Sequence, residues 1–346
     1  MKAYTFTASI NAYTLYKAAK ALNIEVFTTE ENPSYPIPYQ TPDNEQAWLL
    51  FTEEHTLGQA LQGQLIGRFL PPQFPPSLLD DKWAFAAWLA SNKDLPAGLR
   101  QWAIDDKPPP AFPCLLKAKH SWQGSIKLPR GWICRSEHDV QQHLQQVTKM
   151  GLSYQAFFFQ EWLGDQDHQN ISVCGFHDSQ NHSRNTTAIV KRLLSHHQGL
   201  SCAAMVETIP DQWDLLTKTT QVLDALAFVG PYELEFMVAK GEVVILELNP
   251  RFWMQHAIFL ASGNGLVKRY FALDSIADQQ HQILENIVWI DGLYFTKAIL
   301  TGRWQILRLY TQRRFLARRK TLIWPPLRTS VFTLVRRFWS KLAFLA

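Results

Sequence analysis

Several features that define other protein classes are scarce or missing in this sequence. Its 346 residues include only four cysteines, which are far apart and form no CxxC pair, so neither a disulfide framework nor a zinc site is expected. No run of eighteen apolar residues occurs, which argues against a membrane-spanning helix. The N-terminal region lacks the pattern of a signal peptide. From these absences we expect a cytoplasmic protein with reduced thiols.

Three glycine-based motifs are also absent. The sequence contains no GxGxxG dinucleotide fingerprint, no Walker loop and no GxSxG nucleophile elbow. Hydrophobic residues make up 47% of the chain, which is enough apolar surface to bury and excludes a disordered protein. The length indicates two or three packed domains.

Acidic residues are missing after Asp291, whereas twelve of the 34 Lys and Arg residues follow it. The remainder of the chain therefore has a net charge of −8, and the C-terminal segment 276–346 is expected to be a basic, amphipathic and largely helical extension. Its aromatic and basic residues leave three partners open. The extension would pack as a cap on the acidic body, or bind an anionic membrane or a lipid-linked substrate, or bind nucleic acid or an acidic carrier protein.

Apolar periodicity outlines the rest of the chain. Residues 1–75 show strand-like segments flanking the helical segment 10–22, which predicts a βαβ domain with a parallel sheet. A proline cluster at 71–76 marks a domain boundary. Further strands and helices follow, and residues 229–249 form the clearest β-hairpin, with its turn at 239–241.

The hairpin carries the first chemical signal. Glu233, Glu235, Glu247 and Asn249 stand at even spacings within each strand, so each pair projects from one face. Pairing around the turn would bring Glu235 and Glu247 together, and adjacent carboxylates with an amide suit Mg²⁺. Arg251 would lie on the same side and could hold a phosphoryl group. Taken alone, such a pattern is more often a solvated polar face on an edge hairpin than a metal site.

The segments GPYELEF and VVILELNPRFW resemble the metal-binding end of the ATP-grasp superfamily, whose pattern is E-x-E-F followed by E-x-N-P-R. Upstream segments resemble other parts of that family in the same order: Asp81-Lys82, the strand PCLLKAK, the loop SWQGS, the segment FFFQEWLGDQDH and the pair Lys191-Arg192. The resemblance covers roughly residues 76–275. It points to carboxylate–amine ligases of the group containing carbamoyl-phosphate synthase, biotin carboxylase and D-alanine–D-alanine ligase.

The resemblance implies a division of the chain and a set of roles. It implies an α/β and α+β ATP-grasp fold with a Rossmann-like pre-ATP-grasp domain (1–75), a first lobe (76–163), a second lobe with the metal hairpin (164–275) and the C-terminal extension (276–346). ATP would be bound by Lys82, Lys117, Ser125, Gln160, Glu161, Trp162, Leu163, Asp167 and His168. The metal ligands would be Glu235, Glu247 and Asn249, and Arg251 and Lys191 would act on the reacting groups.

Two segments depart from the family pattern. The phosphate loop, residues 119–125, is poor in glycine and contains Trp122, which bears on how freely it moves. Met254-Gln255 replaces the small residues that follow Phe-Trp in many members, so acceptor specificity is expected to differ.

The resemblance implies an ATP-dependent ligase of the acid–amino acid type. A carboxylate would attack the γ-phosphate to give an acyl-phosphate and ADP, and an amine would then displace phosphate to form an amide or peptide-like bond. Two Mg²⁺ ions, or Mn²⁺ in their place, would serve as cofactors. The alternatives are kinase-like phosphoryl transfer without an amine, and a membrane-associated nucleotide-binding module without turnover. A homodimer and an association with the inner face of the membrane are further expectations.

Overall fold

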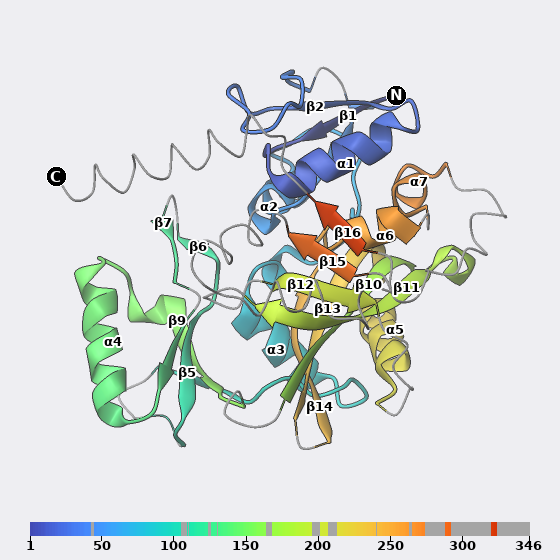
Figure 1. Cartoon of the computed structure of the whole chain (residues 1–346). Helices are drawn as coiled ribbons and strands as arrows, with labels where there is room; N and C mark the ends of the chain where they lie inside the picture. Colours follow the sequence, from blue (N-terminus) through green and yellow to red (C-terminus); the bar gives the residue numbers. More distant parts are fainter. Residues whose placement is uncertain are drawn as a thin grey trace.

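The computed structural model describes residues 1–42, 45–104, 109, 111–123, 126–129, 131–163, 168–195, 201–206, 213–239, 241–262, 265–273, 288–291 and 320–323. In these residues the strands form sheets of three, four and seven strands and one two-stranded ribbon. Figure 1 shows the three-stranded sheet with α1 at the top and the seven-stranded sheet below it. The four-stranded sheet lies with α4 at the lower left. The fold is of the mixed α/β class.

The N-terminal region forms a small parallel sheet. Its elements are β1 (Lys2–Thr5), α1 (Ile10–Lys20), β2 (Glu25–Thr28), β3 (Trp48–Leu50) and α2 (Glu54–Leu61), and the strand order is β2-β1-β3. Both pairings of β1 are parallel, as the βαβ pattern predicts. Ser9 caps α1 by accepting a hydrogen bond from the backbone N–H of Ala12, which fixes where the helix begins.

The next region builds the four-stranded sheet. Its elements are η1 (Pro76–Leu78), α3 (Lys82–Ser91), β4 (Gln101–Ala103), β5 (Cys114–Ala118), β6 (Trp122–Gln123), β7 (Ile126–Lys127), β8 (Trp132–Cys134), α4 (Glu137–Lys149), η2 (Tyr154–Ala156) and β9 (Phe157–Glu161). The strand order is β4-β9-β5-β8, with every pairing antiparallel. One face of this sheet packs on α4 through Leu116, Phe157, Phe159 and Val147.

The large sheet contains β10 (His168–Asp178), β11 (Thr186–Ser195), β12 (Ser201–Val206), β13 (Val229–Ala239), β14 (Glu242–Asn249), β15 (Val288–Asp291) and β16 (Lys320–Ile323). Its order is β14-β13-β10-β11-β12-β15-β16. Four further elements accompany the strands: η3 (His182–Arg184), α5 (Leu215–Ala225), α6 (Ala257–Ser262) and α7 (Leu266–Tyr270). The expected hairpin is confirmed, with Gly241 in the left-handed region (φ 80°) at its turn.

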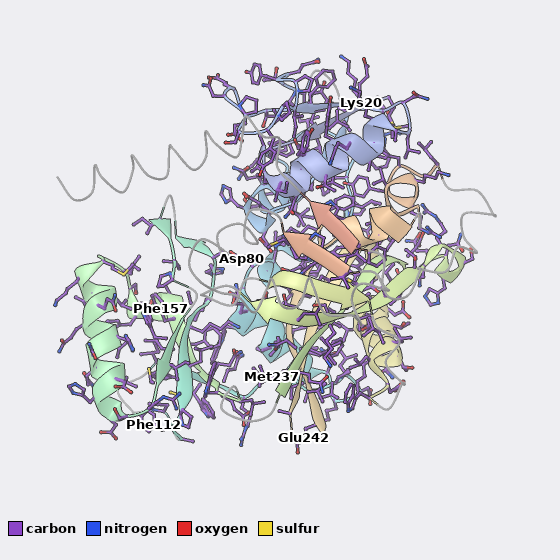
Figure 2. The ribbon with its side chains drawn as sticks, in the orientation of Figure 1. Lys20, Asp80, Phe112, Phe157, Met237 and Glu242 are labelled. Carbon is purple, nitrogen blue, oxygen red and sulfur yellow. The ribbon has the colours of Figure 1, made fainter. Side chains whose placement is uncertain are left out.

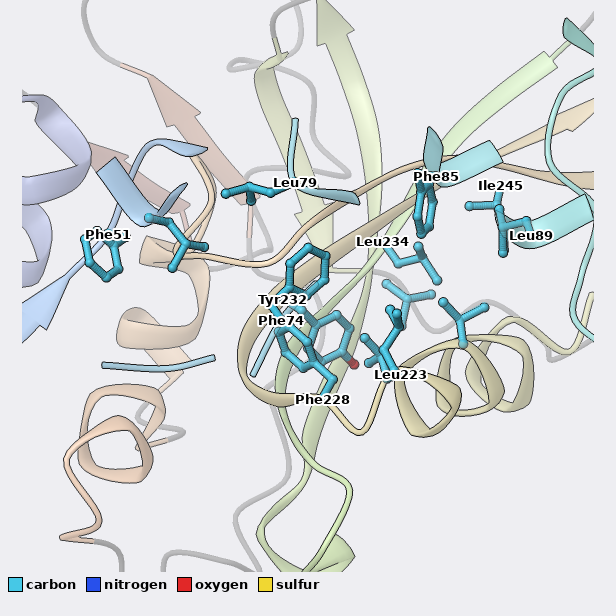
Figure 3. Packing of buried hydrophobic residues seen from close by; sticks show 14 of the residues in the cluster. Phe51, Phe74, Leu79, Phe85, Leu89, Leu223, Phe228, Tyr232, Leu234 and Ile245 are labelled. Carbon is cyan, nitrogen blue, oxygen red and sulfur yellow. The ribbon is translucent and has the colours of Figure 1, made fainter. Parts of the chain in front are cut away.

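Two hydrophobic clusters cover the two faces of the large sheet, and both include residues of the N-terminal region. On one face, Ala3 and Leu15 pack with Phe252 and Trp253, which follow β14. On the other face, the cluster shown in Figure 3 joins Phe74, Phe228 and Tyr232 with side chains of α3 and α5. Each large apolar side chain buried there stabilises the fold by roughly 1.5–3 kcal/mol. The N-terminal sheet and the large sheet therefore share their cores.

The C-terminal extension differs from the expectation in the parts that the structure describes. Residues 288–291 and 320–323 are strands β15 and β16 of the large sheet, not helix. Trp289 is fully buried in a shared core, and this burial explains why an apolar segment there adds to the sheet. The amphipathic segment 329–345 of the extension lies outside the described residues. Within the described residues, no helix has both the length and the apolar character needed to cross a membrane.

Candidate functional site

The β13–β14 hairpin presents its polar side chains on one face of the large sheet. Glu233 pairs in register with Asn249, and Glu235 pairs with Glu247, so the partners project from the same face. Asn249 donates a hydrogen bond from Nδ2 to Glu233 Oε2 at 3.1 Å. A β-bulge interrupts the register directly after Glu235. The predicted meeting of Glu235 and Glu247 across the hairpin is confirmed.

A basic side chain from β11 reaches the same carboxylates. Arg192 donates from a terminal nitrogen to Glu235 Oε2 at 2.9 Å, across the intervening strand β10. Side chains alternate along a strand, so Lys191 projects from the opposite face. It stands in register with Ile171, whose side chain belongs to the cluster on that face. The structure thus places Arg192, and not Lys191 as expected, beside the acidic group.

Burial makes these carboxylates costly to ionise without a positive partner. Removal from water, followed by repulsion from Glu235, raises the pKa of Glu233 to about 8. Burial also raises the pKa of Glu235, an effect that the charge of Arg192 partly opposes and that of Glu247 reinforces. Carboxylate oxygens and an amide are the hard ligands that Mg²⁺ prefers. The donor set therefore fits a divalent cation, which would relieve the repulsion.

Arg251 is held at the end of β14 by contacts from two parts of the chain. Its guanidinium donates to Glu54 at the start of α2, to Asn249 Oδ1 at 3.3 Å and to the backbone carbonyl of Phe252 at 3.0 Å. Its Nε–H is buried and has no acceptor among the described residues. A buried guanidinium with an unused donor is suited to bind an anion that enters the site.

The start of α3 brings a lysine to the same cluster. Asp81 caps α3 by accepting from the backbone N–H of Ala84 at 2.9 Å, so Lys82 is the first helical residue. Lys82 Nζ lies 3.3 Å from Asp80 Oδ1. Burial lowers the pKa of Lys82, but the carboxylates of Glu247, Asp80 and Glu54 raise it by more, and the net shift is upward. Lys82 is therefore a firmly charged cation facing the acidic group.

Asp80 also anchors the segment that follows β5. It accepts hydrogen bonds from the backbone N–H and the hydroxyl of Ser121 at 2.7 and 2.6 Å. Lys82 donates its backbone N–H to the carbonyl of Lys119 at 3.0 Å. The beginning of the expected phosphate loop is thereby fixed to the start of α3.

Strands β5 and β9 carry the expected adenine and phosphate contacts. Lys117 Nζ lies 3.2 Å from Gln160 Oε1, and Lys117 also acts electrostatically on Glu235 of the second lobe. Gln160 and Lys117 share one face of the sheet, whereas Glu161 projects from the other. There Glu161 forms a two-pronged ion pair with Arg100, at 2.6 and 3.1 Å.

Four of the five remaining expected ATP contacts follow β9 in the sequence, and Ser125 precedes it. Trp162 and Leu163 are half-buried, and the buried Nε1–H of Trp162 has no acceptor among the described residues. This unused donor fits a polar ligand at the end of β9. Ser125 and Asp167 lie outside the described residues. The backbone of His168 begins β10, but its side chain is not described.

A pocket of about 320 Å³ adjoins this cluster on the side of α2. Glu54 and Asp80 form part of its wall, and these carboxylates also hold Arg251 and Lys82. The other polar side chains that line it in the described part of the chain are amides and imidazoles: His55, Gln59, Gln62, Gln64 and His120. The pocket thus favours a polar or cationic ligand over an anionic one.

Sequence patterns missed two members of the cluster and did not separate a third from its neighbour. Glu54 and Asp80 carry no motif of their own and reach the site only through tertiary packing. Arg192 adjoins Lys191 in sequence, and strand alternation relative to Glu235 is the signal that could have separated them.

No protein-family model matches the sequence, and no curated protein matches it significantly. Solved structures do resemble the fold. Pyruvate carboxylase from Rhizobium etli has a TM-score of 0.60 at 13% identity, covering 83% of this chain, and this chain spans 29% of its length. The biotin carboxylase domain of 2-oxoglutarate carboxylase from Hydrogenobacter thermophilus, in complex with MgADP and bicarbonate, has a TM-score of 0.59 at 14% identity. That match covers 82% of this chain and 70% of the other.

A third similar structure is N5-carboxyaminoimidazole ribonucleotide synthetase from Thermotoga maritima. Its TM-score is 0.57 at 13% identity, with 79% of this chain and 76% of the other covered. These neighbours are ATP-grasp enzymes, so the resemblance read from the sequence motifs is confirmed at the level of the fold. The chain has the ATP-grasp fold.

Proposed function

We propose that the protein is an ATP- and Mg²⁺-dependent ligase that activates a carboxylate as an acyl-phosphate and couples it to an amine. The observation that carries this proposal is the acidic face formed by the buried Glu233 and the half-buried Glu235 and Glu247, with Arg192 and Arg251 beside it. The MgADP bound by one similar structure supports the same use of the fold.

The acidic face would hold the metal, and the surrounding cations would hold the phosphates. Glu235, Glu247 and Asn249 would bind Mg²⁺, which neutralises phosphate charge and orients the γ-phosphate when bound. Lys82 and Lys117 reach the same space from the first lobe and would contact phosphate oxygens. The nucleotide would thus lie between the segments 76–163 and 164–275, with adenine against the end of β9.

Positioning and charge neutralisation suffice for the chemistry, and no side-chain nucleophile is needed. Arg251 would bind the reacting carboxylate and then the acyl-phosphate through its unused Nε–H. Its contact with Glu54 holds the guanidinium in place before substrate enters. The carboxylate oxygen gains the phosphoryl group, ADP leaves, and the amine then replaces phosphate at the acyl carbon.

The pocket beside α2 would admit the acceptor. It shares Glu54 and Asp80 with the cluster, and its amide and imidazole lining suits an amine with polar substituents. Gln59→Leu would then raise the KM for the amine while leaving the affinity for ATP unchanged. A substitution that weakens ATP binding equally would place the pocket on the nucleotide path instead.

Calorimetric titration with ATP, with and without Mg²⁺, tests the nucleotide site directly. Glu247→Gln removes one proposed ligand, and Glu242→Gln removes an exposed carboxylate from the tip of the same hairpin (Figure 2). We expect Mg²⁺-dependent binding that weakens at least tenfold in Glu247→Gln and is unchanged in Glu242→Gln. No binding by the folded wild type would refute the ligase function.

The second step needs a test of its own. Candidate carboxylates and amines are screened for ADP release, and the products are identified by mass spectrometry. A product that contains both substrates supports ligation. A stable phosphorylated acid that forms without an amine would replace the ligase by a kinase-like phosphoryl transferase.

A further inference from the structure

Two cysteines face each other across neighbouring strands of the four-stranded sheet. Cys114 on β5 stands in register with Cys134 on β8 in an antiparallel pairing. The Cα atoms of such directly opposed residues lie about 4.5 or 5.5 Å apart. Both separations fall inside the window of roughly 4.4–6.8 Å that a disulfide spans. The Cα separation is therefore compatible with a bond between the two side chains.

The two thiols are free and buried. Cys114 and Cys134 are 1% and 0% exposed, and Cys134 donates its S–H to the carbonyl oxygen of Trp132 at 3.8 Å. Interaction between the two sulfurs raises the pKa of Cys114 and lowers the pKa of Cys134. Cys134, which stands on the short edge strand β8, is therefore assigned as the attacking thiolate.

Cys134 lies on an edge strand, and local opening of this strand would expose its thiol to an oxidant. Strand β8 has three residues and stands at the edge of the sheet, where β5 is its only partner among the described strands. Short edge strands open locally at a low cost in free energy. Cys174 offers the contrast: it lies on β10 between β11 and β13, and burial raises its pKa well above the usual range.

We propose that Cys114 and Cys134 form an oxidisable dithiol that a small disulfide of the glutathione type converts reversibly into a cross-strand disulfide. The thiolate of Cys134 attacks one sulfur of the oxidant and releases the first small thiol. Cys114 then attacks the sulfur of Cys134 in the mixed disulfide and releases the second. The two cysteines lose two electrons, and their two protons end on the two small thiols.

The bond would close a ring around a functional part of the chain. Residues 115–133 lie between the cysteines and include Lys117 and Ser121, which contact Gln160 and Asp80. The disulfide would therefore fasten the base of the expected phosphate loop. Its formation does not depend on the proposed ligase function, because neither cysteine contacts the acidic face.

Peptide mapping by mass spectrometry tests the proposal on the full chain. The folded protein is incubated with excess oxidised glutathione, alkylated and digested without reduction. We expect a peptide that links Cys114 to Cys134 and disappears after treatment with dithiothreitol. Oxidation of the folded protein that leaves both thiols free, while urea-unfolded protein does form the link, would overturn the proposal.

Variants separate the two steps of the exchange. Cys114→Ser should stop the reaction at a glutathione adduct on Cys134, whereas Cys174→Ser should leave the cross-link unchanged. Equal glutathione adducts on Cys174 in the folded wild type would contradict the selectivity. Circular dichroism checks that each variant is folded. If a variant does not fold, the peptide map of the wild type still decides whether Cys114 and Cys134 form the disulfide.

Discussion

His256 makes the stability of the protein depend on pH in a way that can be calculated. The imidazole is fully buried, its Nδ1–H donates to the carbonyl of Trp253, and its Nε2 has no partner among the described residues. Burial, with a smaller effect from the nearby charge of Arg251, lowers the pKa of His256 to about 4. The folded protein thus resists adding a proton that the unfolded chain accepts readily.

The sign and size of the effect follow from the two pKa values. Above pH 6.5, the pKa of the histidine in the unfolded chain, His256 is neutral in both the folded and the unfolded state. At such pH values its titration does not reduce the free energy of unfolding. As the pH falls from 6.5 towards 4, the unfolded state binds a proton that the folded state does not, so the free energy of unfolding decreases. At about 1.4 kcal/mol for each pH unit, the loss at about pH 4.5 is roughly 2.5 kcal/mol.

Urea unfolding of the wild type and His256→Asn at about pH 7 and about pH 4.5 measures this contribution. An asparagine amide can replace Nδ1 as the donor but does not titrate, so the variant should lose about 2.5 kcal/mol less over this interval. His138→Asn, at an exposed position on α4, is the control and should follow the wild type. Equal losses in wild type and His256→Asn would refute the reasoning.

Three further outcomes are expected from the same sheet. Arg192→Met should destabilise the ligand-free protein by about 3–5 kcal/mol in urea unfolding, because it leaves Glu235 buried without its partner. Lys191→Met, on the opposite face, should cost clearly less, and a reversed order would contradict the assignment of faces. Gly175→Ala should abolish soluble expression or lower the melting temperature sharply, because its Cβ would lie 1.8 Å from the carbonyl oxygen of Thr186. Normal stability of Gly175→Ala would contradict the close approach of β10 and β11 at Gly175.

Local signals in the sequence predicted the parts of the fold that depend on local chemistry. The βαβ pattern, the hairpin and the start of α3 follow from periodicity, turn residues and capping by Asp81. The facing of Glu235 and Glu247 followed from strand spacing alone. Each of these features is determined within about 25 residues, where propensity and alternation dominate.

Other features depended on contacts between distant segments. The ion pair of Glu54 with Arg251 spans 197 positions, and no spacing rule reaches that far. Strands β15 and β16 were not expected, because short apolar segments fit a strand or a buried helix equally well until a sheet edge is available. The choice of Lys191 over Arg192 failed because it needed the register between β11 and β13.

The sharing of cores between the N-terminal sheet and the large sheet has a consequence for biosynthesis. The hydroxyl of Tyr270 donates to the carbonyl of Leu49, 221 positions earlier, and Phe252 and Trp253 cover the apolar surface of α1 and β1. As the chain leaves the ribosome, the N-terminal segment therefore emerges long before the residues that cover it. Its apolar surface stays exposed to water or bound to a chaperone until residue 270 has been translated. The N-terminal segment therefore completes its core late, and the contacts between distant residues make folding slow.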